Sequence, residues 1–233
     1  MPGRFNQIIN EIVKNNADVI CLQEVSDKTM IENIAKLCKY NHLFFYENMG
    51  LAVLSKSCIL KTYNMEYAVS VVISYMDKQI LFINVHLPWK SAIQREQAIV
   101  DIVSSSNSIK VDYTLILGDF NCSNMSSVHR FLLGEQSLLE HDAYFFDLAE
   151  AYAENNRIIP PPTLNFKENP RFNLDHEINT IQTNQRFDRI LLKNPYPNQY
   201  PILEICGLFG TSISPDTGLS ASDHYGVFAD LIF

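Results

Sequence analysis

Several acidic and imidazole side chains stand at the ends of apolar, strand-like runs. In chain order they are Glu24, His86, Asp119, Asp188, Asp223 and His224. Strand ends on one rim of a sheet can converge, so these side chains could form a single site. Hard divalent ions bind a few carboxylates together with water and substrate phosphate, and dispersed single acids suit them better than a clustered zinc motif. The set therefore favours a Mg²⁺ or Mn²⁺ site that handles a phosphate group.

Each of these residues also has an ordinary structural interpretation when it is taken alone. Glu24 could be a solvated acid at a strand end, and Asp119 could form an Asx turn, which is common for Asp after a strand. Asp188 with Arg189 could form a surface ion pair that contributes little, and His86 could be a satisfied core histidine. Only the combination of these residues favours a functional site.

The hydrophobic pattern predicts the elements that would position these residues. Apolar side chains over 5–16 follow helical spacing, and successive strand-like runs over 44–87 predict an antiparallel meander. The other predicted elements are strands at 19–22, 114–119, 187–192, 202–206 and 227–233, and helices at 27–40, 90–104 and 126–133. Residues 155–186 are predicted to form a long loop. This alternation predicts two packed sheets with helices outside, in one α/β domain over residues 1–233.

Composition limits the classes of function. The formal net charge of −8 argues against a broad basic face that binds nucleic acid, although an enzyme that contacts few phosphates is compatible with it. The five cysteines are scattered and form no CxxC, so they are expected to be buried thiols. No secretory signal and no apolar run of ~20 residues is evident. We therefore expect a monomer without integral membrane association, located in the cytoplasm or, in a eukaryote, the nucleus.

Five short motifs make the interpretation specific. They are LQEV at 22–25, NVHL at 84–87, GDFN at 118–121, FDRILL at 187–192 and SDHYGV at 222–227. In this order and approximate spacing they resemble the endonuclease/exonuclease/phosphatase superfamily over almost the whole chain. LAVLSK at 51–56 is similar to a further segment of that family. The resemblance implies a four-layer α/β sandwich, with two packed, mostly antiparallel mixed sheets and helices outside.

The resemblance also implies roles for the residues in the first motifs. Glu24 would bind the divalent metal, and Asp119 would orient or deprotonate the attacking water. Asn121 would hold that water or donate a hydrogen bond to the phosphoryl oxygen as charge develops there. His86 would be a second donor to the phosphate.

The last two motifs supply the remaining site residues. Asp188 would hydrogen-bond His224 and fix its tautomer, so that His224 serves as a proton carrier or, when protonated, as an oxyanion clamp. Asp223 would lie near the metal or a second ion.

Three residues that follow the His86 run could contact substrate. They are Trp89, Lys90 and Arg95. The alternative interpretation is a helix start with an aromatic anchor. His42, His129, His141 and His176 match no motif and are assigned to surface or loop packing, and the acids from Asp142 to Glu154 to a solvated face.

The beginning of the sequence departs from the family pattern. Family members begin with a strand that carries an Asn beside the metal, whereas this sequence starts at Met1-Pro2-Gly3, within the loop after that strand. The first strand of the family is therefore expected to be missing. A start codon placed too late, a fragment, and a natural shortening with reduced catalysis all remain open.

The motif style indicates a branch of the superfamily. LQEV, FDRI and SDHYGV resemble the tyrosyl-DNA phosphodiesterase 2, sphingomyelinase and deadenylase-like branches, because Val25-Ser26 stands where abasic-site endonucleases carry a Lys. The leading hypothesis is a phosphodiesterase that acts on nucleic acid or a nucleotide-linked end, with a role in DNA repair. A sphingomyelin or inositol-phosphate phosphoesterase and a catalytically impaired binding module are the alternatives.

Overall fold

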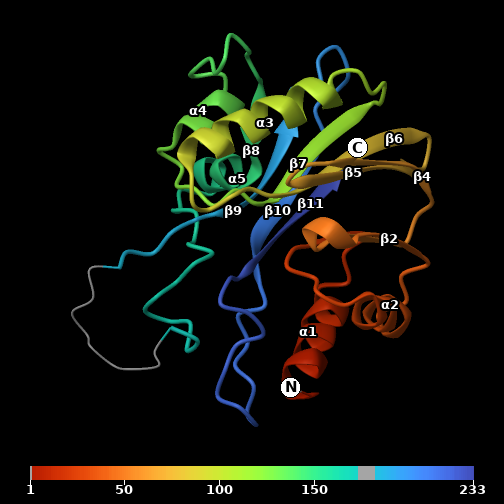
Figure 1. Ribbon diagram of the computed structural model, residues 1–233, viewed down its shortest axis with the longest axis vertical. Helices are drawn as coiled ribbons and strands as arrows, with labels where there is room; N and C mark the ends of the chain where they lie inside the picture. Colours follow the sequence, from red (N-terminus) through yellow and green to blue (C-terminus); the bar gives the residue numbers. More distant parts are fainter. Residues whose placement is uncertain (1, 173–181) are drawn as a thin grey trace.

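The larger sheet forms the rigid centre of the molecule. The computed structural model describes residues 2–172 and 182–233 (Figure 1). The sheet has six strands in the order β4-β5-β6-β7-β9-β8. Their bounds are β4 Ile59–Met65, β5 Ala68–Tyr75, β6 Lys78–His86, β7 Tyr113–Asp119, β8 Phe145–Asp147 and β9 Asp188–Lys193. All neighbours pair antiparallel except β6 and β7, whose parallel pairing requires the crossover helix α3 (Ala92–Ser106).

A second layer of strands covers one face of this sheet in two parts. One part has three strands in the order β1-β3-β2, and the other pairs β10 with β11. Their bounds are β1 Val19–Leu22, β2 His42–Tyr46, β3 Leu51–Ser55, β10 Ile202–Phe209 and β11 Gly226–Ile232. Leu51 and Val53 pack on Val69 and Val71 of β5. The β10–β11 pair packs on the half of the sheet that contains β7 and β9.

Helices form the two outer layers. α3 and α4 (Ser127–Leu132) cover the outer face of the six-stranded sheet through a large apolar cluster. On the other side, α1 (Pro2–Asn15) and α2 (Lys28–Leu37) pack on the three-stranded sheet through Ile12, Ile31 and Ile34. Figure 1 shows these two pairs of helices on opposite sides of the strands. A short helix, α5 (Leu148–Asn156), packs against β9 and β10, and η1 (Glu47–Met49) joins β2 to β3.

This architecture confirms the predicted mixed α/β sandwich and corrects the predicted meander over 44–87. β2 and β3 pair with each other in one sheet, while β4, β5 and β6 form the meander in the other. The chain passes between the layers at Lys56-Ser57. Both kinds of strand carry apolar side chains, so the pattern alone could not indicate which layer each strand joins. In addition, β8 was not predicted, because three residues are too few to show a period.

Several predictions about single side chains are wrong because tertiary contacts bury or expose them. His129 is buried, not on the surface, and Asp147 is buried, not part of a solvated face. Cys122 and Cys206 are buried as expected, whereas Cys58 is exposed and Cys21 and Cys38 are half-buried. His176 lies outside the described residues. Among the described helices, none has the length and apolar character needed to cross a membrane.

Candidate active site

Strand register brings three of the predicted residues into one row. His86 pairs with Asp119 across the parallel strands β6 and β7, and Asp119 pairs with Asp188 across β7 and β9. Residues that are opposite one another in neighbouring strands point to the same face of a sheet. The three side chains therefore stand side by side at one rim of the six-stranded sheet, although they are far apart in the sequence.

His224 reaches the same rim from the second layer. It precedes β11, and its Nδ1 lies 2.9 Å from Oδ2 of Asp188. Potential ligand atoms of Asp119, Asp188 and His224 all lie within 4.8 Å of one another. Nε2 of His86 lies 3.7 Å from Oδ2 of Asp119, which is too far for a good hydrogen bond. The cluster therefore joins both strand layers of the sandwich.

Burial and charge shift the pKa values of this cluster. Asp119 is buried, and burial together with the negative charge of Asp188 raises its pKa to about 7. Burial disfavours the charged form of His224, but the hydrogen bond and the charge of Asp188 outweigh it and raise its pKa to about 9. Burial lowers the pKa of His86. Burial and the charge of Asp188 thus set the pKa values of Asp119 and His224 apart, at about 7 and about 9.

The turn after β7 fixes Asp119 and Asn121. Asn121 has a positive φ of 49°, and its backbone N–H donates to Oδ1 of Asp119 at 2.7 Å. Its side-chain Nδ2 donates to the carbonyl of Leu87 at 2.9 Å. This hydrogen bond ties the turn after β7 to the residue that follows β6. Gly118 has a φ of 130°, and a Cβ there would lie 2.2 Å from the carbonyl oxygen of Val85. A glycine is therefore required where β7 approaches β6.

A buried amide holds the end of β1 beside this rim. Gln23 donates from Nε2 to Oδ1 of Asn84 at 2.6 Å, and Asn84 in turn donates to the carbonyls of Leu22 and Ala52, each at 3.0 Å. Glu24 follows with a positive φ of 57°. Its carboxylate is exposed and close enough to raise the pKa of both His86 and Asp119. The charge of Glu24 therefore acts on the same residues that form the rim.

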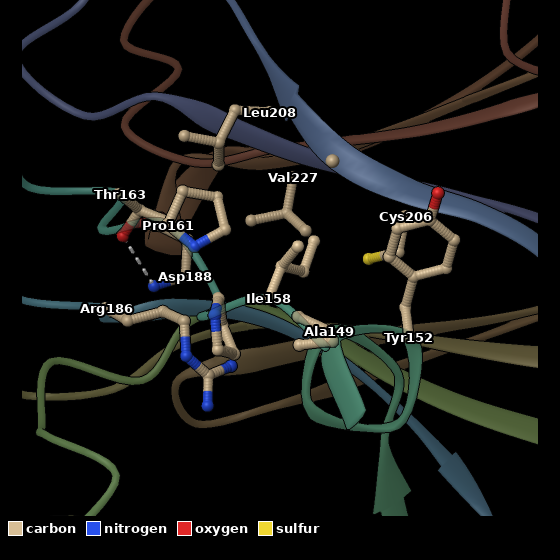
Figure 2. A pocket seen from close by; sticks show the side chains of 13 residues that line it. Ala149, Tyr152, Ile158, Pro161, Thr163, Arg186, Asp188, Cys206, Leu208 and Val227 are labelled. Carbon is tan, nitrogen blue, oxygen red and sulfur yellow. Dashed lines mark hydrogen bonds between the residues drawn. The ribbon is translucent and has the colours of Figure 1, made fainter. Parts of the chain in front are cut away.

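Thr163 of the long loop holds the start of β9, which carries Asp188, and the turn between His224 and β11. The Thr163 hydroxyl accepts hydrogen bonds from the backbone N–H groups of Phe187 and Asp188, at 3.1 and 3.2 Å, and its carbonyl accepts one from Tyr225. Figure 2 shows the bond to Asp188 beside a cavity of about 20 Å³. That volume holds about one water molecule, so the cavity is not a substrate site.

Asn169 fixes the turn that carries Asp223. Its Nδ2 donates to the carbonyls of Ser222 and Asp223, both at 2.9 Å, and its Oδ1 accepts from the hydroxyl of Ser220. The Asp223 carboxylate is exposed next to His224 and helps to raise the His224 pKa. Gln23 and Asn84 stand inside the motifs LQEV and NVHL, but their supporting contacts were not predicted. The contacts of Thr163 and Asn169 were not predicted either, because single polar residues in a loop have no periodicity.

The three residues predicted to contact substrate differ in whether their side chains are already bound within the protein. Arg95 donates from Nη1 to the carbonyls of Pro88 and Trp89, at 3.0 and 2.8 Å, and so closes the loop before α3. Trp89 is 69% exposed, and Nζ of Lys90 lies 5.3 Å from the centre of its ring. The structure thus favours an anchoring role for Arg95 and leaves Trp89 and Lys90 on the surface near His86.

A second group of acidic and imidazole side chains lies away from this rim. It contains His129, Asp147 and Glu150. Arg186 donates to both carboxylates, at 2.7 Å to Asp147 and 2.5 Å to Glu150. A guanidinium already neutralises these acids, so the group is an internal ion network and not a cation site.

The fold and the rim together define the class of protein, an α/β sandwich of the DNase I-like type. The model of the Endonuclease/Exonuclease/phosphatase family matches residues 1–224, and the chain belongs to that family. No curated protein sequence matches the chain.

Solved structures show the same fold at low sequence identity. A humanized D. rerio TDP2 with 14 mutations has a TM-score of 0.77 and 14% identity, with 100% of this chain and 92% of that chain covered. D. rerio TDP2 complexed with a single strand DNA product has a TM-score of 0.76 and 15% identity, covering 98% and 91%. Sphingomyelinase C from Streptomyces griseocarneus has a TM-score of 0.62 and 15% identity, covering 99% and 91%.

Proposed function

We propose that the protein is a Mg²⁺- or Mn²⁺-dependent phosphoesterase that hydrolyses phosphodiester bonds in nucleic acid or at a nucleotide-linked end. The observation that carries the proposal is the meeting of Asp119, Asp188 and His224 at one rim, from both strand layers. Family membership supports the phosphoesterase class. The fold shared with a TDP2 complexed with single strand DNA product supports the choice of nucleic acid.

The donor set fits a hard divalent cation. The carboxylate of Glu24 is exposed and, within the described parts of the chain, makes no hydrogen bond or ion pair. Carboxylate oxygens are the ligands that Mg²⁺ and Mn²⁺ prefer. Glu24 would hold the ion, with Asp223 near it or near a second ion. When bound, the ion would offset the negative charge of the phosphoryl oxygens, which otherwise repel a nucleophile.

The side chains of the site would each have a separate role in hydrolysis. Asp119 would orient the attacking water and accept its proton, because its carboxylate stands at the centre of the row. Asn121, in the turn after Asp119, and His86, opposite Asp119 on β6, would donate hydrogen bonds to the phosphate. His224 would clamp a phosphoryl oxygen or carry a proton, and Asp188 would hold the His224 ring through Nδ1. Trp89 offers an exposed ring on which a base could stack, with Lys90 beside it.

Hydrolysis of a defined panel tests the proposal. The panel contains 5′-tyrosyl oligonucleotides, plain single- and double-stranded oligonucleotides, sphingomyelin and a phosphoinositide, each with Mg²⁺ or Mn²⁺ and with EDTA. Asp119→Asn is the inactive reference, and Asp101→Asn, on the exposed face of α3, is the matched control. We expect metal-dependent cleavage of an oligonucleotide that Asp119→Asn loses and Asp101→Asn retains.

Other outcomes would redirect the assignment. Cleavage of sphingomyelin or the phosphoinositide alone would support the lipid alternative, whose fold is represented by the sphingomyelinase. Metal binding seen by calorimetry without turnover of any substrate would support a binding module and reject the enzyme.

A further inference from the structure

Two arginines meet at the turn that leads into the candidate active site. Arg4, in the first turn of α1, donates from Nε to the carbonyl of Ala221 at 2.9 Å. Arg171, in the long loop, donates from Nε to the carbonyl of Ser220 at 2.8 Å. Figure 1 shows the amino end of α1 beside the loop that joins β10 to β11. Two guanidinium groups from distant parts of the chain are therefore held on adjacent residues of one turn.

Further hydrogen bonds anchor the segments that carry these arginines. The backbone N–H of Arg171 donates to Oδ1 of Asn169 at 3.1 Å, and Asn169 also holds the turn that carries Asp223. One turn further along α1, Gln7 donates to the carbonyls of Ser212 and Leu219, at 2.8 and 3.1 Å. Side chains that are already held in place lose little conformational freedom when a ligand binds, which favours binding.

The outer nitrogens of both guanidinium groups have no partner in the described parts of the chain. Within residues 2–172 and 182–233, the side chains of Arg4 and Arg171 form no ion pair and no hydrogen bond besides those from Nε. Arg4 is exposed and Arg171 is half-buried. Each group thus offers its two Nη atoms, a planar pair of donors that matches two oxygens of a phosphate. The pair can therefore bind an oxyanion.

The two positive charges repel each other. Burial lowers the pKa of Arg171, and the charge of Arg4 lowers it further, so the two guanidinium groups are close enough to interact. The charge of Asp223 opposes this shift, although its carboxylate forms no ion pair with either arginine in the described residues. Like charges near one another disfavour the charged forms. A bound anion would remove this repulsion, which the stability of the fold alone does not explain.

The arginine pair lies beside the rim of the candidate active site. Ala221 stands three residues before His224, so their Cα atoms are within roughly 11 Å of each other. Arg4 and His224 line the same cavity, and the charge of Asp223 acts on both Arg171 and His224. A phosphate held by the arginines would thus be a neighbour of the phosphate at His224. A nucleic acid strand carries a phosphate at every linkage, whereas sphingomyelin carries a single one.

We propose that Arg4 and Arg171 together bind a second phosphate of the substrate strand, next to the phosphate that is hydrolysed. The inference rests on the proposed function, because it requires a substrate with more than one phosphate. The two arginines hold the strand and touch no reacting atom. Their loss therefore lowers the affinity for the strand and leaves the chemical step itself unchanged.

Binding of a short single strand tests the proposal without any need for activity. Affinity is measured by fluorescence anisotropy in Asp119→Asn, with Mg²⁺ and a low NaCl concentration held constant. The strand is used unmodified and with one phosphate at a time replaced by an uncharged methylphosphonate. We expect one such replacement to weaken binding by about tenfold, and Arg4→Gln and Arg171→Gln each to weaken binding of the unmodified strand by a similar factor.

The coupling between the variants and the replacement is the decisive readout. In each single variant the replacement should weaken binding less than in the parent chain, and in the double variant it should have no effect. Lys14→Gln removes an exposed cation from the same helix, about 15 Å along its axis from Arg4. This control should keep both the affinity and the full effect of the replacement. Melting temperatures confirm that each variant is folded.

Each remaining outcome overturns the proposal. Variants that weaken binding while every replacement keeps its full effect would show that the arginines only hold the turn. That result, together with cleavage of the strand by the unsubstituted chain, would reject this inference and leave the proposed function intact. A strand that does not bind at all would reject both. Variants that lose binding of an inositol phosphate but not of the strand would assign the pair to a lipid headgroup.

Discussion

At the scale of single residues, the central question is why Asp119 should tolerate burial beside another carboxylate. Its pKa is raised to about 7 by burial and by Asp188, so ionisation near neutral pH opposes folding. A folded-state pKa above the unfolded value for an acid means that stability falls as the pH rises from 3.8 through about 7. Such a residue is poorly explained by stability and is consistent with function.

The first prediction therefore concerns Asp119→Asn. Turnover of the oligonucleotide cleaved in the panel should fall by about 10³-fold, which is typical for loss of a positioned base. The melting temperature at pH 7.5 should be unchanged or higher, because a neutral amide removes the cost of a buried charge. Thermal melts and single-turnover rates measure the two effects. Loss of activity through unfolding would instead give Asp119 a structural role.

The second prediction concerns the Asp188–His224 pair. Asp188→Asn should lower the His224 pKa from about 9 toward its ordinary 6.5, since it removes the carboxylate that holds the imidazolium. The raised value stabilises the folded state fully below pH 6.5, and this stabilisation is lost as the pH rises through 9. NMR titration of the His224 ring in metal-free protein measures the shift. Asp216→Asn, an exposed acid in the preceding loop, should leave it unchanged.

At the scale of elements, the strand ends were predictable and the contacts that join them were not. The runs ending at Glu24, His86 and Asp119 carry a clear apolar pattern, and family order made their convergence an expectation. The register between strands could not be predicted in this way, because it depends on pairing partners far away in the sequence. The alignment of His86, Asp119 and Asp188 in one row follows from the pairing of β6, β7 and β9. The Thr163 contacts come from a loop without any pattern.

The third prediction tests the close approach of β6 and β7. Gly118→Ala places a Cβ 2.2 Å from the Val85 carbonyl at a φ of 130°, so either the strands separate or the backbone changes. We expect a loss of about 3 kcal/mol in unfolding free energy, the upper range for local backbone strain. Gly218→Ala is the control, since its φ is also positive, at 67°, but its Cβ would meet nothing within 4 Å. It should cost about 1 kcal/mol. Equal losses in urea melts would contradict the close-contact explanation.

The fourth prediction concerns Thr163, which holds β9 through its hydroxyl and the turn before β11 through its carbonyl. Thr163→Val preserves the shape and removes the acceptor for the N–H groups of Phe187 and Asp188. Unfolding free energy should fall by about 1–3 kcal/mol, the cost of leaving buried donors unpaired. Turnover should also fall, since Asp188 loses its support. Thr62→Val, on the exposed face of β4, should change neither quantity.

At the scale of the whole molecule, the sequence predicted the layers but not how they divide. Period-2 and period-3.6 patterns identify strands and helices, yet they do not assign β2 and β3 to one sheet and β4 to another. The open edges of β1 and β11 are likewise a property of the assembled layers.

The fifth prediction follows from the charge of the whole chain. The net charge of −8 argues against a broad basic surface that neutralises many phosphates. The affinity for an oligonucleotide should therefore depend weakly on salt. Because log K falls with log[salt] at a slope of about −0.7 per phosphate neutralised on a single strand, a slope smaller in magnitude than about 2 is expected. Binding of Asp119→Asn to a labelled single strand at several NaCl concentrations, with Mg²⁺ held constant, measures this slope.

Lys90 provides the matched test of that slope. Its ammonium lies over the exposed ring of Trp89 near the end of β6, where it could contact a single phosphate. Lys90→Gln should reduce the magnitude of the slope by about 0.7, the contribution of one phosphate contact on a single strand. Lys110→Gln, at an exposed position of the loop between α3 and β7, should leave the slope unchanged. A steep slope that neither variant alters would mean that nucleic acid is bound on another face, and would separate binding from the rim of Asp119, Asp188 and His224.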